Sequence, residues 1–321
     1  MPWYWRLTNL VLEPPHCSDP LSLPGLEPVL NSLGISDSRA WRTRWADVGG
    51  SSLALEAWGH PVTDAFVWSV GFPLLTALEG AADHPQRQLF GLSGLPGCGK
   101  STLTRWIAAA AKEIDLPIAV ISLDDFYYPG EELDRVMAGN PWRVPRALPG
   151  SHDLSLLQRA MDSWRTSGLL RAPCFEKSLR HGKGDRSGWS EQRGQVCLLE
   201  GWFVGVRPSS QLGDDPLLTT AERDYQPLVQ KHLARYVPLW ESLDGLWHLR
   251  ASNVEATRLW KRQQEETMHR RTGVQLPAPA LNSFVRMIET AMPQASYQHL
   301  EHANVVVHLN DTREVLELTR A

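Results

Sequence analysis

The chain has 321 residues, 42% hydrophobic and 21% charged, a composition typical of a globular protein and not of a disordered one. Its 32 basic and 36 acidic residues give a net charge of −4, which argues against nucleic acid and anionic membranes as partners. Four widely spaced cysteines argue against a disulfide framework or a zinc site and favour a reducing cytoplasm.

Residues 1–85 contain several prolines and no catalytic motif. Residues 1–12 do not have the pattern of a signal peptide, and no run approaches the roughly 18 apolar residues of a membrane helix. Apolar-periodic stretches at 38–45 and 53–58 predict short helices. We therefore predict an accessory, mainly helical region at 1–85 of a cytoplasmic protein and a catalytic domain at 86–321.

From residue 88 onward, short apolar runs alternate with amphipathic stretches. The apolar runs predict strands at 88–92, 116–123, 196–199, 245–249 and 305–309. The amphipathic stretches predict helices at 100–114, 132–138, 154–167 and 254–271. Strands that alternate with helices favour parallel pairing, so we expect an α/β fold with a doubly wound, mainly parallel sheet.

The turn after the first strand of this domain fits the P-loop pattern G-x-x-x-x-G-K-[ST]. Glycines let successive backbone N–H groups converge on phosphate oxygens, and the following helix adds its positive end. Lys100 is expected to neutralise the β- and γ-phosphates of ATP, and the Ser101 hydroxyl to bind Mg²⁺. The predicted nucleotide-binding residues are Gly94, Leu95, Pro96, Gly97, Cys98, Gly99, Lys100, Ser101 and Thr102.

Two acids follow the next strand, at the edge of an open α/β sheet where ligands bind. Asp124 is our candidate for the base that accepts the proton of a substrate hydroxyl, and Asp125 for a residue that holds the metal through water. The alternative is that both acids cap the following loop.

The strand at 196–199 ends in Glu200, the position of a Walker-B acid, which is expected to orient the water ligands of Mg²⁺. An acid at a strand end is often only a surface residue. Lys100 and Asp124 upstream favour the metal role.

The order of these motifs resembles the superfamily of phosphoribulokinase, uridine kinase and pantothenate kinase. Four segments resemble more specifically the D-glycerate 3-kinase family of plants, fungi and cyanobacteria. They are Asn140-Pro141 leading to Gly150-Ser151-His152-Asp153-Leu154, Pro173-Cys174-Phe175-Glu176-Lys177-Ser178, Gly182-Lys183-Gly184-Asp185-Arg186, and Leu199-Glu200-Gly201-Trp202. The resemblance covers about residue 90 to the C-terminus. Glu176 stands where the family pattern has Asp.

The resemblance implies that Asp153 accepts hydrogen bonds from substrate hydroxyls and that Lys177 and Arg186 flank the acceptor pocket. Glycerate carries a carboxylate and two hydroxyls, so its pocket needs a cation and an acceptor. Arg143 and Arg146 are further candidates for the carboxylate. Each of these cations could instead be a solvated surface charge, and the basic segment at 177–186 could be a disordered loop.

The polar helix at 254–271 places Arg258 and Arg262 on one face. It could be a lid, with Arg262 meeting the transferring phosphoryl group, as the resemblance of this segment to the family's W-[KR]-x-Q-Q-E pattern implies. It could equally be an exposed helix with Arg–Glu ion pairs on its surface.

The sequence thus predicts a Mg²⁺-dependent phosphotransferase with an alcohol group as acceptor, most specifically ATP:D-glycerate 3-phosphotransferase. One alternative is a kinase of the same fold acting on a nucleoside, pantothenate or a sugar phosphate. Another is a nucleotide-binding regulatory module without transfer activity, against which the set Lys100, Ser101, Asp124 and Glu200 argues.

Overall fold

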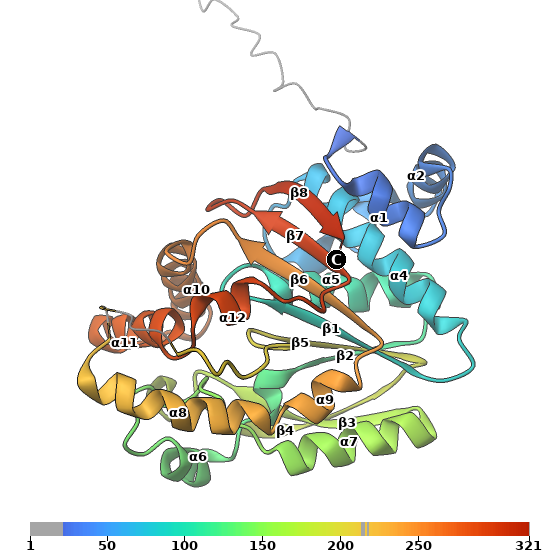
Figure 1. The fold of residues 1–321 in the computed structure, drawn as a ribbon. Coiled ribbons are helices and arrows are strands. Elements are labelled where there is room, and N and C mark those ends of the chain that lie inside the picture. The colour runs from blue at the N-terminus through green and yellow to red at the C-terminus, as the bar shows by residue number, and fades with distance from the viewer. Residues whose placement is uncertain (1–21, 213–215, 217, 321) are drawn as a thin grey trace, which may run out of the picture.

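The computed structural model describes residues 22–212, 216 and 218–320. Its centre is a six-stranded sheet of order β2-β5-β1-β6-β7-β8, with parallel pairs throughout except for β8, which is antiparallel to β7 (Figure 1). The strands are β1 Gln88–Gly94, β2 Ile118–Ser122, β5 Val196–Gly201, β6 Gly245–Ala251, β7 Val305–Leu309 and β8 Val315–Arg320. A separate antiparallel pair consists of β3 Leu169–Glu176 and β4 Asp185–Arg193.

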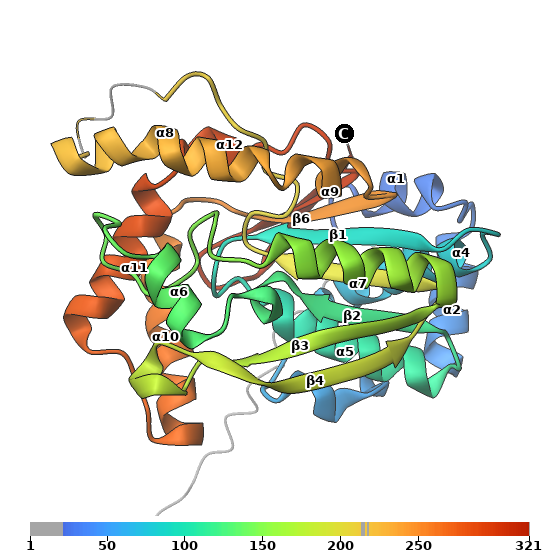
Figure 2. The ribbon, with the colours of Figure 1, turned by 90° about the horizontal axis from the view of Figure 1, so that it is seen from below.

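The apolar runs of the sequence form the central strands, which confirms the predicted α/β class. All six residues of β5 are buried, as expected for a strand with a neighbour on each side and helices on both faces. Figure 2 shows α8, α9 and α12 on one side of the sheet and α5 on the other. The helices of this part are α5 Lys100–Glu113, α6 Gly130–Val136, α7 Leu154–Ser167, α8 Thr220–Ala234, α9 Val237–Glu241, α10 Ala256–Thr272, α11 Ala278–Thr290 and α12 Gln294–Gln298.

The described part of the predicted accessory region is helical. It contains α1 Leu26–Ser32, α2 Ser38–Asp47, α3 Asp64–Phe66, a π-helical turn Val67–Gly71 and α4 Phe72–Ala82. The ring of Trp58 stacks on that of Trp106 in α5 at 5.4 Å, and the Trp106 indole N–H donates to the Leu53 carbonyl at 2.8 Å. Buried residues of α1, α2 and α4 belong to the same hydrophobic core as those of the central strands. The boundary at residue 85 stays a prediction, and residues 1–12 lie outside the described residues.

Within the described ranges, one helical run, Asp64–Ala82, is long and apolar enough to cross a membrane, with a mean hydropathy of 1.4. Two thirds of its most apolar window (67%) is buried inside the protein. The buried side chains of core helices have the same composition, so the run is explained by its packing. The cytoplasmic location stays a prediction.

Several elements have no clear signal in the sequence, among them the β3–β4 pair. The side chains of β4 are mostly exposed or half-buried, so this strand has no apolar periodicity. The basic segment at 177–186, for which a disordered loop was one expectation, instead contains a short helical turn, Arg180–Gly182, and the start of β4. This segment folds back toward the carboxyl end of β2, where it supplies residues to the site described next.

Candidate active site

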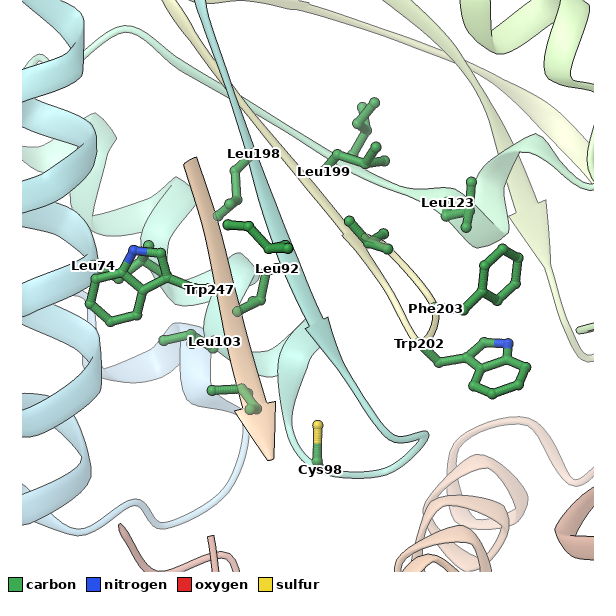
Figure 3. Packing of buried hydrophobic residues seen from close by; sticks show 14 of the residues in the cluster. Leu74, Leu92, Cys98, Leu103, Leu123, Leu198, Leu199, Trp202, Phe203 and Trp247 are labelled. Carbon is green, nitrogen blue, oxygen red and sulfur yellow. The ribbon is translucent and has the colours of Figure 1, made fainter. Parts of the chain in front are cut away.

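The loop after β1 has the backbone geometry of a phosphate cradle. Gly94, Gly97 and Gly99 have φ values of 155°, 84° and 105°, a region that disfavours other residues. A Cβ atom on Gly97 would lie 2.6 Å from Cβ of Trp260 in α10, so only glycine allows this approach. Figure 3 shows Cys98 at this turn, beyond the end of β1. Because α5 begins at Lys100, its N–H groups and its positive end face the loop.

The P-loop lysine and serine both have polar partners close to the loop. Buried Lys100 donates through Nζ to the carbonyls of Gly94 at 2.6 Å and Leu95 at 3.1 Å. The Ser101 hydroxyl donates to Oε1 of Glu200 at 2.6 Å. A hydroxyl oxygen beside a buried carboxylate is a donor set suited to Mg²⁺, which prefers hard oxygen ligands. The residues present therefore fit both ATP and Mg²⁺.

Asp124 has a partner on each carboxylate oxygen. Nζ of Lys177 lies 2.6 Å from Oδ2, and the Tyr127 hydroxyl donates to Oδ1 at 2.7 Å. Burial acts to raise the pKa of Asp124, but the Lys177 ammonium and these two hydrogen bonds outweigh it and hold the pKa well below its usual range. Asp124 is therefore ionised and hydrogen-bonded at neutral pH.

Asp125 follows Asp124 in a 3₁₀-helical turn, Leu123–Phe126, and not at the end of an extended strand as the sequence predicts, and its carboxylate has partners of its own. Its carboxylate accepts from the N–H groups of Ser122 at 3.3 Å and Phe175 at 3.2 Å. Burial, together with the charges of Asp124 and Glu200, raises its pKa to about 6, although the two backbone hydrogen bonds act to lower it. Both oxygens are thus engaged with backbone, so the loop-capping interpretation holds for this acid. Its role at the metal stays a prediction.

Asp153 and Arg186 lie together beside the loop that carries Tyr127. Asp153 caps α7 by accepting from the Leu156 N–H at 2.9 Å, and Nη2 of Arg186 lies 3.4 Å from its other oxygen. Arg186 also donates through Nε to the Tyr127 carbonyl at 2.9 Å. The structure brings this predicted pair together, while its contact with substrate hydroxyls stays a prediction.

Of the two arginines proposed for the carboxylate, only one is buried. Arg143 is exposed, whereas Arg146 is buried and donates to the carbonyls of Gly182 at 2.7 Å and Lys183 at 2.6 Å. Its guanidinium carbon lies 5.3 Å from the ring centroid of Phe284. Burial lowers the pKa of Arg146, and the charge of Asp124 opposes this effect.

On α10, the sequence pattern indicated Arg262, which is exposed in the structure. The neighbouring Lys261, which the pattern did not indicate, is buried. Nζ of Lys261 lies 2.9 Å from Oε1 of Glu265 and 5.2 Å from the centroid of Phe284. The spacing of Trp260, Lys261 and Glu265 on one helical face was a signal that could have identified the buried lysine. The phosphoryl-contact role of Arg262 stays a prediction.

His152 and Tyr127 are two further residues that motif reasoning did not single out. Their rings stack at 4.4 Å, and Nδ1 of His152 lies 2.9 Å from the Tyr236 hydroxyl. Burial lowers the pKa of His152 to about 3, so the ring is neutral at physiological pH. This stack fixes Tyr127 and, through its hydroxyl, the orientation of Asp124.

No protein-family model matches the chain. Among curated proteins, the uncharacterized kinase mug58 of Schizosaccharomyces pombe is 28% identical over 241 residues, which cover 69% of this chain and 84% of that protein. The chloroplastic D-glycerate 3-kinase of Arabidopsis thaliana is 31% identical over 287 residues. That match covers 80% of this chain and 62% of the plant protein, so the chain spans somewhat less than two thirds of it.

Among solved structures, D-glycerate 3-kinase from Cryptococcus neoformans var. grubii superposes with a TM-score of 0.63 at 23% identity, covering 74% of this chain and 91% of that one. The YGR205w protein gives 0.62 at the same identity and coverage. At this identity the likeness shows the fold, which is that of a P-loop kinase. Together with the sequence relatives, it identifies the chain as a P-loop kinase whose homologues include D-glycerate 3-kinase.

Proposed function

We propose that this kinase transfers the γ-phosphoryl group of ATP to the 3-hydroxyl of D-glycerate, giving ADP and 3-phosphoglycerate. The observation that carries the proposal is the meeting of the P-loop with the Asp124–Lys177 pair at the carboxyl edge of three adjacent strands, β1, β5 and β2. Relatives named D-glycerate 3-kinase in sequence and in fold support this acceptor.

The P-loop would hold the triphosphate of ATP. Its N–H groups and the ammonium of Lys100 would bind the phosphate oxygens, which would replace the loop carbonyls that Lys100 contacts in this structure. Ser101 and Glu200 would hold Mg²⁺, with Asp125 behind them. The metal would neutralise phosphate charge as the bond to the leaving oxygen breaks.

Asp124 would accept the proton of the attacking hydroxyl. A carboxylate with a depressed pKa is a weak base, but phosphoryl transfer through a loose transition state needs little basicity early in the step. Asp124 would therefore first orient the hydroxyl by accepting its hydrogen bond and take the proton late. As the oxygen–phosphorus bond forms, the bond to the ADP oxygen breaks and ADP leaves with that electron pair.

Other residues would bind the acceptor, and a helix would close the site. Asp153 and Arg186 would contact the glycerate hydroxyls from the far side of Tyr127. Helix α10, which touches the P-loop through Trp260, would act as a lid and bring Arg262 to the phosphoryl group. Its closure would exclude water and limit idle hydrolysis of ATP.

The test is ADP release from Mg·ATP by the purified full chain, with and without D-glycerate, and with the phosphate position of the product read by NMR. We expect release that depends on glycerate and yields 3-phosphoglycerate. Release that is indifferent to glycerate would overturn the acceptor. Nucleosides would be the next acceptors to screen, because a putative uridine kinase of Schizosaccharomyces pombe is 35% identical over 125 residues.

A further inference from the structure

Three cationic side chains from different parts of the chain converge beside the P-loop edge of the sheet. Lys177 follows β3, Arg146 lies in the connection before α7, and Lys261 belongs to α10. Arg146 and Lys261 are only 3% and 7% exposed. Buried cations are costly unless a counter-charge is present, so the charges around them need to be accounted for.

The counter-charges on the protein do not balance this cluster. Lys177 pairs with Asp124, and Lys261 pairs with Glu265. Arg146 donates to two backbone carbonyls, and no carboxylate among the described residues lies within ion-pair distance of it. The cluster thus has one positive charge in excess, and two of its three cations, Arg146 and Lys261, are buried, whereas the Lys177 side chain is 35% exposed.

The excess charge is concentrated around one aromatic ring. Arg146 lies 5.3 Å and Lys261 5.2 Å from the centroid of Phe284, a buried residue of α11. Burial, together with the charges of Arg146 and Lys177, lowers the pKa of Lys261 to about 8, although Glu265 acts to raise it. Two buried cations that contact the same ring, with one carboxylate partner for the two of them, favour the binding of an anion.

We propose that Arg146 and Lys261, seated on Phe284, form the subsite that binds the carboxylate of a hydroxy-acid acceptor and directs its hydroxyl toward Asp124. The proposal rests on the phosphotransfer function proposed above, and it names the feature that selects acids over neutral polyols and nucleosides. Arg146 supplies the unpaired charge, and Lys261 supplies a second donor from the helix that closes over the site. A carboxylate there would neutralise the excess charge and favour closure of α10.

The most informative variant is Lys261→Met, because methionine has a side chain of similar length and an apolar stem but no ammonium group. We expect the KM for D-glycerate to rise about 10- to 100-fold, with the KM for ATP changed less than about twofold. Lys261→Arg should restore most of the affinity for glycerate. Arg270→Gln is the matched control, because it removes an exposed cation from the same helix.

A different pattern would contradict the carboxylate subsite. If Lys261 instead contacts the transferring phosphoryl group, Lys261→Met will lower kcat and acceptor-free hydrolysis together and leave the KM for glycerate unchanged. If Lys261→Met alone unfolds because Glu265 loses its partner, the double variant Lys261→Met and Glu265→Gln removes both charges and permits the same measurement.

Binding without turnover separates this proposal from the proposed function. In the presence of Mg²⁺ and a non-hydrolysable ATP analogue, D-glycerate, lactate and glycolate should each raise the melting temperature of the wild type but not of Lys261→Met. Such shifts without glycerate-dependent ADP release would retain the subsite and discard D-glycerate phosphorylation. Equal shifts in both proteins, or none with any hydroxy acid, would overturn the subsite.

Discussion

The ammonium of Lys177 lies 2.6 Å from a carboxylate oxygen of Asp124, which joins the segment after β3 to the end of β2. Tyr127 holds the second oxygen at 2.7 Å. An acceptor hydroxyl must therefore share or displace one of these partners before it can use Asp124 as a base. The same two contacts hold the carboxylate in a single orientation, which is the preorganisation that a proton acceptor needs.

Replacing Asp124 with Asn should lower kcat about 10²- to 10⁴-fold, because the amide keeps the shape but cannot take the proton. The affinity for ATP should change less than about threefold, since the P-loop contacts are made by other residues. Steady-state ADP release and ATP titration by calorimetry would measure both quantities. Asp162→Asn, on the exposed face of α7, is the control. Wild-type turnover in Asp124→Asn would remove it as the base.

Replacing Glu200 with Gln should raise the Mg²⁺ concentration for half-maximal activity about 10- to 100-fold. The amide still accepts the hydrogen bond from Ser101, which the carboxylate receives at 2.6 Å, so the fold should be retained. Titration of ADP release with Mg²⁺ at fixed ATP would measure the shift. An unchanged Mg²⁺ requirement would show that Glu200 does not serve the metal.

Replacing Gly97 with Ala should weaken ATP binding at least about tenfold. The new Cβ would lie 2.6 Å from Cβ of Trp260, and the residue would keep a φ of 84°, so either the loop or α10 must move. Equilibrium binding of a fluorescent ATP analogue would measure the loss. Gly80→Ala in α4 is the control, because no atom lies within 4 Å of its added Cβ.

His248 in β6 should make the protein less stable in mild acid. Burial lowers its pKa to about 3 from an ordinary 6.5, so the unfolded chain binds an extra proton between these values. Stability is therefore full above pH 6.5 and is lost as the pH falls toward 3, by about 1.4 kcal/mol per pH unit from this group. In His248→Leu, urea unfolding from pH 7 to 4.5 should give a shallower pH dependence. An identical slope in both proteins would contradict the assignment.

The sequence predicted those elements whose signal is local. The P-loop and the buried strands are contiguous patterns, so β1, β5, β7 and α5 lie within one or two residues of their expected ends. The acid at each strand end could be placed because parallel strands bring their carboxyl ends to one edge. Family resemblance added Lys177 to this neighbourhood.

What the sequence could not predict depends on contacts between distant segments. The pairing of Lys177 with Asp124 requires the β3–β4 pair to turn back on β2, and the polar strand β4 gives no periodic signal. The choice between Lys261 and Arg262 depends on which face of α10 packs against Phe284, a residue of the next helix. From the sequence alone, the buried cation of a polar helix cannot be distinguished from its exposed neighbour, because the helix that packs against it is not known.

At each edge of the central sheet, another segment bonds backbone groups of the outermost strand. At one edge, the side chain of Gln192 bonds the N–H and carbonyl of Val120 in β2, at 2.9 and 2.7 Å. At the other, the Leu318 N–H of β8 donates to the Pro24 carbonyl at 2.9 Å. These bonds occupy outward-facing backbone groups of both edge strands, which disfavours pairing with a strand of a neighbouring molecule at these positions.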